Sequence, residues 1–317
     1  MVNQTTSNQL KIAFFGECMV ELSGSPIRKA FGGDTLNTAL YLSRLTANQA
    51  VSVSYATGLG VDELSKEMIQ QWQQEGIDTN LVTQFEDKLP GLYMVEVDDT
   101  GERQFLYWRD NAAVKSYFSG QQVSALETEM QTKSIDVIYL SGISFAILDI
   151  VSRQHLLTLI EQFAQRGGKV VFDNNYRPQL WSVTDAKYWY GKLLPFVDIA
   201  LITEDDDVLV WGEEESVEHR CLRLGCKEIV IKRGCEPCKL VLNNADGLAE
   251  HYVSAEKVTN VVDTCAAGDS FAAGYLAARL TGSSAIESAE LGHKMASIVI
   301  QHPGAIIPRS AMDALVR

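Results

Sequence analysis

Short apolar segments and amphipathic helical segments alternate along most of this 317-residue chain. Apolar runs typical of strands lie at 11–16, 51–55, 137–140, 169–172, 199–202 and 228–231. Patterns typical of helices lie at 36–45, 62–75, 152–166, 218–224 and 271–280. Strands joined by helices run parallel, and the helices then cover both faces of the sheet. The alternation therefore predicts an α/β fold built on a mostly parallel sheet flanked by helices.

Two segments, 17–31 and 92–108, interrupt this alternation because neither contains a helical pattern. Each has turn-forming residues in its middle, at 23–26 (SGSP) and 98–101 (DDTG). We predict two hairpins that pair into a small separate β-sheet, which would form a lid over a cleft. The predicted domains are a core of 10–16, 36–88 and 113–317, a β-lid of 17–35 and 89–112, and a flexible tail of 1–9.

The composition favours one large core and argues against several kinds of partner. Hydrophobic residues make up 46% of the chain, and the formal net charge is −14. This charge repels nucleic acid and anionic membrane surfaces, so we expect neither as a partner. No apolar run reaches the roughly 18 residues of a membrane span, and we recognise no signal peptide. We therefore expect a soluble, cytoplasmic protein.

The six cysteines include a C-x-x-C pair, Cys235 and Cys238, with Cys221 and Cys226 shortly before it. A zinc site is one interpretation of this group. However, the first two cysteines have poor spacing for a zinc knuckle, and Pro237 places the second pair in what reads as a hairpin turn. We expect free thiols.

The segment 263–271 (DTCAAGDSF) carries the strongest indication of chemistry. Asp269 follows three small residues, and the apolar run at 271–280 is typical of a helix. Small side chains let an anion approach backbone N–H groups, and the positive end of the helix dipole attracts it. A carboxylate beside a bound phosphate can take the proton of an attacking hydroxyl. We interpret Asp269 as that base; the alternative is a helix start whose residues are small by chance. The anion site would consist of Ala266, Ala267 and Gly268.

A second glycine-rich segment, 31–37 (FGGDTLN), connects the first predicted hairpin to a helix. Its two glycines permit close approach of the backbone to a ligand. Asp34 and Asn37 supply polar groups on one side of the helix start. Ligand binding and a plain hairpin exit with a helix cap are equally consistent with this pattern.

Basic side chains occur where predicted strands end. Arg109 ends the second hairpin, and Arg177 follows the strand at 169–172. Because α/β sheets bind ligands at the carboxyl ends of their strands, both are candidates for holding a carboxylate or phosphate. Surface ion pairs are the alternative. The loop after 228–231 is a further candidate for phosphate or ribose contact, although its composition is ordinary for a strand end: Lys232, Arg233 and Gly234.

Two common nucleotide-binding sequences do not occur. Gly58 and Gly60 begin a G-x-G-x-x-G pattern, but position 63 is Glu. The chain also has no G-x-x-x-x-G-K-[ST] run. A nicotinamide-dependent oxidoreductase is therefore disfavoured, and any nucleotide must be held by another phosphate-binding loop.

The run at 263–271, the Gly-Gly-Asp at 32–34 and the expected β-lid together resemble the ribokinase-like (PfkB) carbohydrate kinases. The resemblance extends from about Lys11 to Pro308, nearly the whole chain, and the run at 263–271 is highly specific. Within the family, four strings look like those of kinases acting on 2-keto-3-deoxygluconate: FGGDTLNTALYLSRL (31–45), TGERQFLYWRDNAA (100–113), FDNNYRPQLW (172–181) and VDTCAAGDSFAAGYLA (262–277).

The resemblance implies a Rossmann-like core with a β-sheet lid, and phosphoryl transfer from Mg·ATP to the C6 hydroxyl of 2-keto-3-deoxygluconate. It also implies that Asp269 is the base and that 266–268 form the anion hole. The implied sugar-binding residues are Gly33, Asp34, Asn37, Tyr93, Tyr107, Arg109 and Arg177. The implied nucleotide-binding residues are Asn175, Thr203, Lys232, Arg233, Gly234, Ala266 and Gly268, with His293 and Ser297 of a helix at 286–300 near the adenine.

One segment departs from the family pattern. Many relatives carry Asn-x-x-Glu after a strand, and this motif organises Mg²⁺ and phosphate. Here 203–206 reads Thr-Glu-Asp-Asp, so the Asn is missing and Asp replaces the Glu. We therefore assign no metal ligand.

Several alternatives stay open. Another sugar kinase of the family, of the fructokinase or ribokinase type, is the closest of them. A sugar-acid sensor without activity is a second, although a pure binder has no use for a base at position 269. Two arginines in one pocket of so acidic a chain favour an anionic sugar. The exposed lid edge is a candidate surface for a homodimer.

Overall fold

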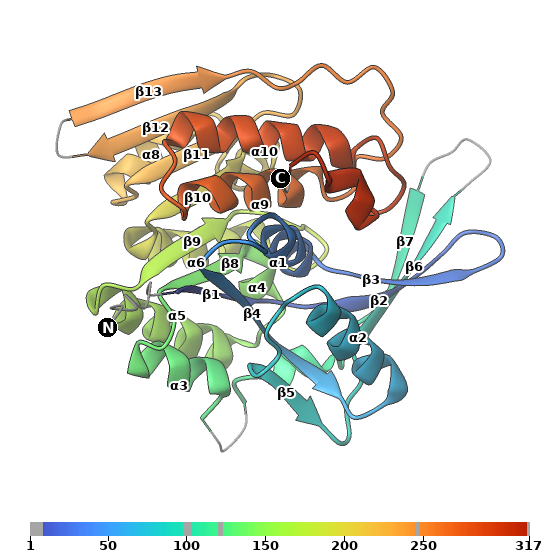
Figure 1. The fold of residues 1–317 in the computed structure, drawn as a ribbon. Coiled ribbons are helices and arrows are strands. Elements are labelled where there is room, and N and C mark those ends of the chain that lie inside the picture. Colours follow the sequence, from blue (N-terminus) through green and yellow to red (C-terminus); the bar gives the residue numbers. More distant parts are fainter. Residues whose placement is uncertain (1–8, 98–102, 120–122, 245–246, 316–317) are drawn as a thin grey trace, which may run out of the picture.

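A computed structural model describes residues 9–97, 103–119, 123–244 and 247–315, and these residues form two β-sheets (Figure 1). The larger sheet has the strand order β13-β12-β11-β10-β9-β8-β1-β4-β5. Its strands are β1 (Leu10–Phe15), β4 (Val51–Gly60), β5 (Val82–Phe85), β8 (Val137–Ser141), β9 (Lys169–Asp173), β10 (Ile199–Thr203), β11 (Glu228–Lys232), β12 (Cys238–Asn244) and β13 (Gly247–Val253). Neighbouring strands from β11 to β5 pair in parallel, whereas β12 and β13 pair antiparallel. The predicted mostly parallel α/β fold is confirmed.

Helices cover both faces of this sheet. One face carries α1 (Asp34–Leu45), α2 (Glu63–Gln74), α9 (Ala267–Arg279) and α10 (Ala285–Val299). The other carries α3 (Ala125–Thr132), α4 (Gly142–Ala146), α5 (Ile150–Gln165), α6 (Val183–Leu193), α7 (Glu204–Trp211) and α8 (Val217–Arg223). Within the described ranges, no helix is long and apolar enough to cross a membrane.

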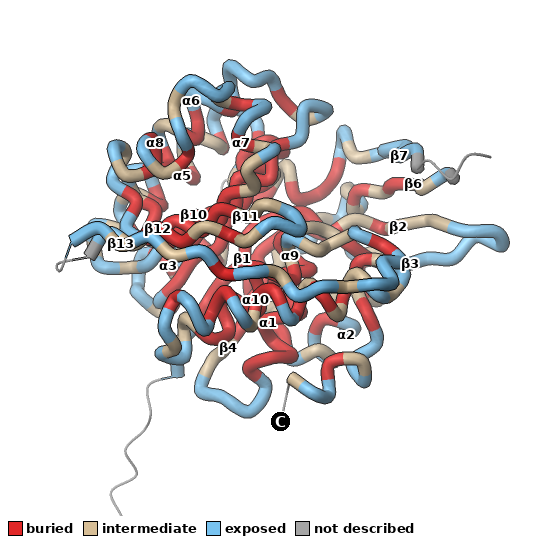
Figure 2. Tube along the Cα trace, turned by 90° about the horizontal axis from the view of Figure 1, so that it is seen from above, coloured by how far each residue is buried: buried red, intermediate tan, exposed pale blue. Residues whose placement is uncertain are grey.

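Strand β1 shows how the sheet supplies both hydrophobic layers. Ile12 and Phe14 pack in the cluster that contains α1, α9 and α10, whereas Ala13 and Phe15 pack in the cluster of the opposite face. All four side chains are fully buried, as expected where successive side chains point to opposite sides of a covered sheet. Figure 2 shows the buried residues concentrated along these central strands.

The smaller sheet contains β2 (Met19–Ser23), β3 (Arg28–Gly32), β6 (Gly91–Val97) and β7 (Arg103–Trp108), in the order β3-β2-β6-β7. Strands pair antiparallel within each hairpin, and β2 pairs with β6 in parallel. The sheet projects from one side of the core (Figure 1), so the predicted small second sheet is present. The predicted turn at 98–101 lies outside the described residues, and the domain boundaries stay a prediction.

The predicted hairpin turn near the C-x-x-C pair connects β11 to β12, which pair antiparallel. Cys235 is exposed in this turn, whereas Cys238 is buried at the start of β12. The two side chains therefore lie in different environments.

Candidate active site

A cavity of about 430 Å³ lies between the small sheet, the carboxyl ends of the central strands and the start of α9. Its position at the carboxyl edge of a parallel sheet is the usual place for ligand binding in this architecture. Most of the residues singled out from the sequence line it: Gly33, Asp34, Asn37, Tyr93, Tyr107, Asn175, Arg177, Thr203, Lys232, Ala266, Ala267, Gly268 and Asp269.

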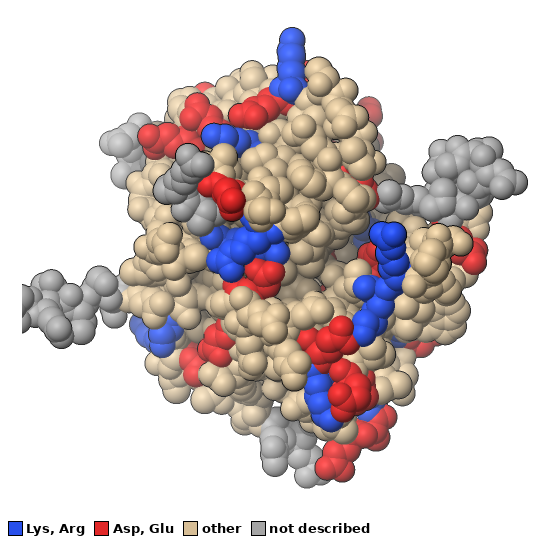
Figure 3. All heavy atoms as spheres, turned by 45° about the vertical axis from the view of Figure 1, so that its right-hand side comes forward, with Lys and Arg blue, Asp and Glu red and all other residues tan. Residues whose placement is uncertain are grey.

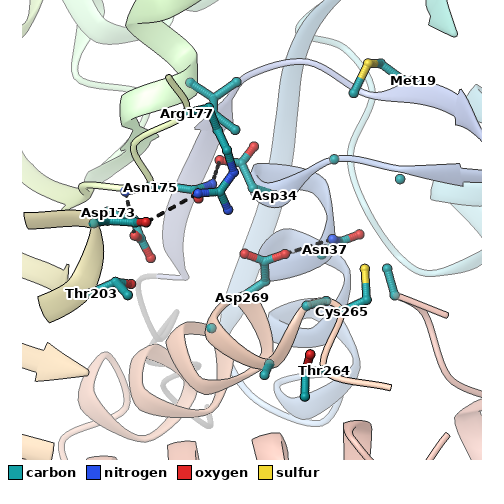
Figure 4. A pocket seen from close by; sticks show the side chains of 18 of the residues that line it. Met19, Asp34, Asn37, Asp173, Asn175, Arg177, Thr203, Thr264, Cys265 and Asp269 are labelled. Carbon is teal, nitrogen blue, oxygen red and sulfur yellow. Dashed lines mark hydrogen bonds and ion pairs between the residues drawn. The ribbon is translucent and has the colours of Figure 1, made fainter. Parts of the chain in front are cut away.

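Asp269 stands in the first turn of α9 and contacts Asn37 of α1 at the edge of the cavity (Figure 4). The Asn37 side chain donates a 2.8 Å hydrogen bond from Nδ2 to Oδ2 of Asp269. Burial and the nearby Asp34 carboxylate raise the pKa of Asp269 to about 7, although the Asn37 hydrogen bond lowers it. A carboxyl group with this pKa can accept a proton near neutral pH and later release it.

The loop before Asp269 brings backbone N–H groups to the cavity. Ala266 caps α9 in the left-handed conformation, with φ of 57°, which costs about 1–2 kcal/mol for a residue with a Cβ. This conformation turns the chain into the helix at Ala267, whose first N–H groups have no acceptor within the helix. These groups and the helix dipole together form a site suited to an anion.

Lys232 lies beside this loop. A Cβ built on Gly268 would lie 3.6 Å from the Lys232 Nζ, so the ammonium group is close to the helix start. Lys232 also forms a 2.6 Å ion pair with Asp173 at the end of β9, and both side chains are at most 10% exposed. The pair fixes a positive charge where an anion would meet the N–H groups of α9.

Asp34 and Asn175 form the opposite wall. The Asn175 amide donates a 2.5 Å hydrogen bond to Oδ2 of Asp34, which joins the start of α1 to the end of β9. The Asn175 backbone N–H donates to Asp173 Oδ1 at 3.3 Å. Asp34 is therefore oriented by a neighbour that itself depends on Asp173.

Asn174 connects the ends of β9 and β10. Its amide donates to the Thr203 carbonyl at 3.0 Å and its Oδ1 accepts from the Thr203 backbone N–H at 2.9 Å. These two bonds hold Thr203 and the start of α7 against the cavity. Asn174 directly follows the strand at 169–173. This place at the carboxyl edge of the sheet is the sequence feature from which its role near the site could have been predicted.

The segment 203–206, whose sequence differs from the family pattern, still provides a carboxylate. Asp206 lines the cavity, and burial raises its pKa, although Arg177 opposes that rise from 3.4 Å. In the described part of the chain, no group of three or more His, Cys, Asp or Glu side chains could hold a metal ion by itself. Mg²⁺ in kinases is held by one or two carboxylates together with phosphates and water, and Asp173 and Asp206 fit that requirement.

Arg109 lines a second cavity of about 280 Å³ that shares Asp34, Tyr107 and Arg177 with the first. Its guanidinium forms an ion pair with Glu17, a buried residue that the sequence did not single out. Lys115 lines the same cavity, which adds a third cation to Arg109 and Arg177.

Four residues predicted to bind the nucleotide are not among the residues that line the first cavity. Arg233 pairs with Glu204 at 3.3 Å, and Gly234 lies in the turn that follows β11. His293 is buried against the Val253 carbonyl at 3.0 Å, and Ser297 donates to Glu256 at 3.2 Å. Their role in nucleotide binding stays a prediction.

Charges of both signs are interspersed over the face seen in Figure 3. With a net charge of −14, any anionic ligand would have to be held by local groups and not by the overall charge of the chain.

Comparison with known proteins gives consistent matches over nearly the whole chain. Residues 9–312 match the family described as pfkB family carbohydrate kinase. The 2-dehydro-3-deoxygluconokinase of Escherichia coli strain K12 is 49% identical, with 96% of this chain and 99% of that protein covered. The enzyme of the same name from Dickeya dadantii is 48% identical, with 98% and 100% covered.

Solved structures share the fold. A fructokinase from Xylella fastidiosa with bound ATP has a TM-score of 0.80 at 19% identity, with 97% of this chain and 98% of that chain covered. An Escherichia coli protein provisionally described as ribokinase II, in complex with ATP and Mg²⁺, has a TM-score of 0.80 at 19% identity and covers 97% and 99%.

Proposed function

The chain belongs to the pfkB family of carbohydrate kinases, and we propose that it transfers the γ-phosphoryl group of ATP to the C6 hydroxyl of 2-keto-3-deoxygluconate, also called 2-dehydro-3-deoxygluconate. The names of relatives 48–49% identical over nearly their full length support this substrate. The observation that carries the chemistry is the Asp269 carboxylate, which faces the cavity at the start of α9 with a pKa of about 7.

In the proposed mechanism, Asp269 takes the proton of the C6 hydroxyl as that oxygen attacks the γ-phosphorus. The bond from this phosphorus to the β–γ bridging oxygen breaks, and ADP leaves. Asn37 holds the carboxylate toward the cavity through its 2.8 Å hydrogen bond. General base catalysis of this kind contributes about 10²–10⁴-fold to a rate.

The start of α9 and Lys232 would stabilise the negative charge of the transferred group. Backbone N–H groups of 266–268 would bind the phosphate, and Lys232 lies beside Gly268, held by Asp173. Such preorganised donors stabilise charge where it develops in the transition state. When bound, Mg²⁺ would neutralise phosphate charge, and Asp173 and Asp206 are the carboxylates that would hold it.

The carboxylate of the sugar acid would lie toward the second cavity, at Arg109 and Arg177. Gly33, Asp34 and Asn37 would bind the sugar hydroxyls. Tyr93 and Tyr107, whose ring centroids lie 5.9 Å apart, would cover the sugar from the small sheet. A hydrogen bond between charged partners discriminates roughly 10- to 150-fold against a neutral sugar.

A panel of sugars with Mg·ATP tests the proposal through ADP release. We expect the highest kcat/KM with 2-keto-3-deoxygluconate and much lower values with fructose and ribose. If fructose or ribose gives the higher value, the substrate assignment is wrong and a fructokinase or ribokinase activity replaces it. If the sugar acid binds in calorimetry but no sugar yields ADP, the protein is a sensor.

The small sheet also supports a proposed homodimer. Leu106 and Trp108 of β7 are 40% and 58% exposed, and they lie on the opposite side of the strand from Phe105 and Tyr107, which line the cavity. Apolar groups exposed together on one face of a sheet suit a second copy of the chain. Sedimentation of the native protein and of Trp108→Lys tests this: the native protein should sediment as a dimer and the variant as a monomer. Because ATP is made and used inside the cell, the proposed site of action is the cytoplasm.

A further inference from the structure

Glu17 and Arg109 form a buried ion pair at the junction between the small sheet and the core. Glu17 lies between β1 and β2, and Arg109 directly follows β7. Their side chains are 2% and 10% exposed. Taking two charges out of water costs several kcal/mol per ion before their attraction offsets it, so the position of this pair calls for an explanation other than stability.

The backbone is packed closely around Glu17. A Cβ on Gly33 would lie 2.1 Å from the Glu17 carbonyl oxygen, and a Cβ on Gly91 would lie 2.5 Å from Glu17 Oε1. Gly33 follows β3, and Gly91 begins β6. Glu17, Gly33, Gly91 and Arg109 therefore mark the four described connections between the small sheet and the core, and the other three all meet Glu17: Gly33 at its backbone carbonyl, Gly91 and Arg109 at its carboxylate.

The ion pair leaves hydrogen-bonding capacity on the arginine. Glu17 accepts from the NH2 group of Arg109, while Nε of Arg109 and Oε1 of Glu17 are buried with no hydrogen-bond partner among the described residues. Arg109 lines the second cavity together with Lys115 and Arg177. Glu17 thus holds the Arg109 guanidinium on one side, and the Nε–H of Arg109 remains available as a hydrogen-bond donor.

We propose that Glu17 is a positioning residue, which holds the Arg109 guanidinium in the orientation that receives the carboxylate of the sugar acid. This inference rests on the proposed function. Glu17 acts through Arg109 and does not touch the substrate. Without the Glu17 charge, the long arginine side chain loses its fixed orientation. Each binding event must then order it again at a cost in conformational entropy, which raises KM more than it lowers kcat.

A double-mutant cycle tests the inference with 2-keto-3-deoxygluconate as substrate. We expect Glu17→Gln to lower kcat/KM at least about 10-fold, mainly through KM. We expect the variant Glu17→Gln/Arg109→Gln to match Arg109→Gln alone within about twofold, because a residue that acts through Arg109 has no effect once Arg109 is absent. The inference is wrong if the double variant loses kcat/KM by the product of the two single losses. It is also wrong if KM of Glu17→Gln equals or falls below the native value.

Glu67→Gln is the matched control. Glu67 of α2 pairs with Lys29 of β3, so it also joins core to small sheet, but both side chains are more than a third exposed. This variant should keep the native KM, and a comparable loss in it would contradict a specific role for Glu17. If Glu17→Gln does not fold, Glu17→Asp decides instead: it keeps the charge but shortens the side chain, and a native KM in it would equally overturn the inference.

The native protein separates this inference from the proposed function. If native protein releases no ADP with the sugar acid, the proposed function fails. If native protein is active and the cycle shows no coupling, only the role of Glu17 fails.

Discussion

Asn37 and Asp269 meet through a 2.8 Å hydrogen bond, although 232 positions separate them in the chain. The bond joins α1 to α9 at the edge of the cavity. Because Asn37 donates to the ionised carboxylate, it both orients Asp269 and opposes the rise in its pKa that burial causes. Several consequences can be measured.

Asp269→Asn should lower kcat by about 10³-fold or more while the dissociation constant of the sugar acid changes little. The amide keeps the shape of the side chain but cannot accept the proton. ADP release and calorimetry measure the two quantities. Asp205→Asn is the control, since Asp205 is exposed on α7 and does not line the cavity; a variant at 269 that retains a tenth of the native kcat would contradict the base assignment.

Asn37→Leu should move the acidic limb of the kcat/KM profile upward by one to two pH units. Leucine has the same branched arrangement of side-chain heavy atoms but cannot donate, and a hydrogen bond to a charged group contributes roughly 1.5–3 kcal/mol, or about one to two units of pKa. The native profile should fall below pH 7, where Asp269 becomes protonated. The pH of half-maximal kcat/KM is the measurement, whatever the absolute rate, and an unshifted limb would show that another group controls it.

Asp269→Asn should also be more stable than the native protein at pH 8 but not near pH 4. The folded pKa of about 7 exceeds the unfolded value of ~3.9, so the folded state binds the proton more tightly. The stability that this proton provides is complete below pH ~4 and is lost as pH rises through 7. Melting temperatures of both proteins from pH 4 to pH 8 test the sign, and a constant difference would mean that the pKa is not raised.

Arg109→Ala should lower kcat/KM for the sugar acid roughly 10- to 150-fold and leave that for fructose nearly unchanged. Because the variant leaves the Glu17 carboxylate buried and unpaired, its melting temperature should fall as well. Both substrates must therefore be assayed well below that temperature. Arg28→Ala, which removes an exposed arginine of the small sheet, is the control and should leave kcat/KM for both sugars unchanged. If Arg109→Ala lowers kcat/KM equally for both sugars, Arg109 has no role in selecting the anion.

Gly33→Ala should destabilise the protein by about 1–3 kcal/mol, because the new Cβ would lie 2.1 Å from a backbone oxygen of Glu17 and the backbone must move. The displaced start of α1 carries Asp34 and Asn37, so KM for the sugar should rise in the same variant. Gly191→Ala is the control, since a Cβ there meets nothing closer than 4.0 Å. Denaturant unfolding and KM for both variants give the comparison.

Most strands and helices of the core follow from the apolar patterns of the sequence, but two helix starts do not. Helix α9 was expected from 271 and begins at Ala267, because the Gly-Asp of its first turn falls outside the apolar run even though an acidic residue is favourable there. Helix α7 was missed because four acidic residues occupy its first turn and break the apolar periodicity. The run at 263–271 predicts Asp269 and the small residues before it as one candidate site, since these residues are contiguous.

Contacts between distant segments could not be predicted in this way. The pair of Lys232 with Asp173 spans 59 positions, and that of Arg109 with Glu17 spans 92. Periodicity places each residue on a strand end but does not say which partner lies opposite. For the same reason, helical spacing could not show that His293 turns toward the Val253 carbonyl.

The strand order has a consequence for biosynthesis. From β1 outward, β4 and β5 extend the large sheet on one side, and β8 to β13 extend it on the other in order of synthesis. A nascent chain can thus add its strands to the edges of the sheet one after another as it leaves the ribosome. The Asn37–Asp269 contact cannot form until α9 emerges, so an unfinished chain has most of its sheet but lacks the carboxylate that we propose as the base.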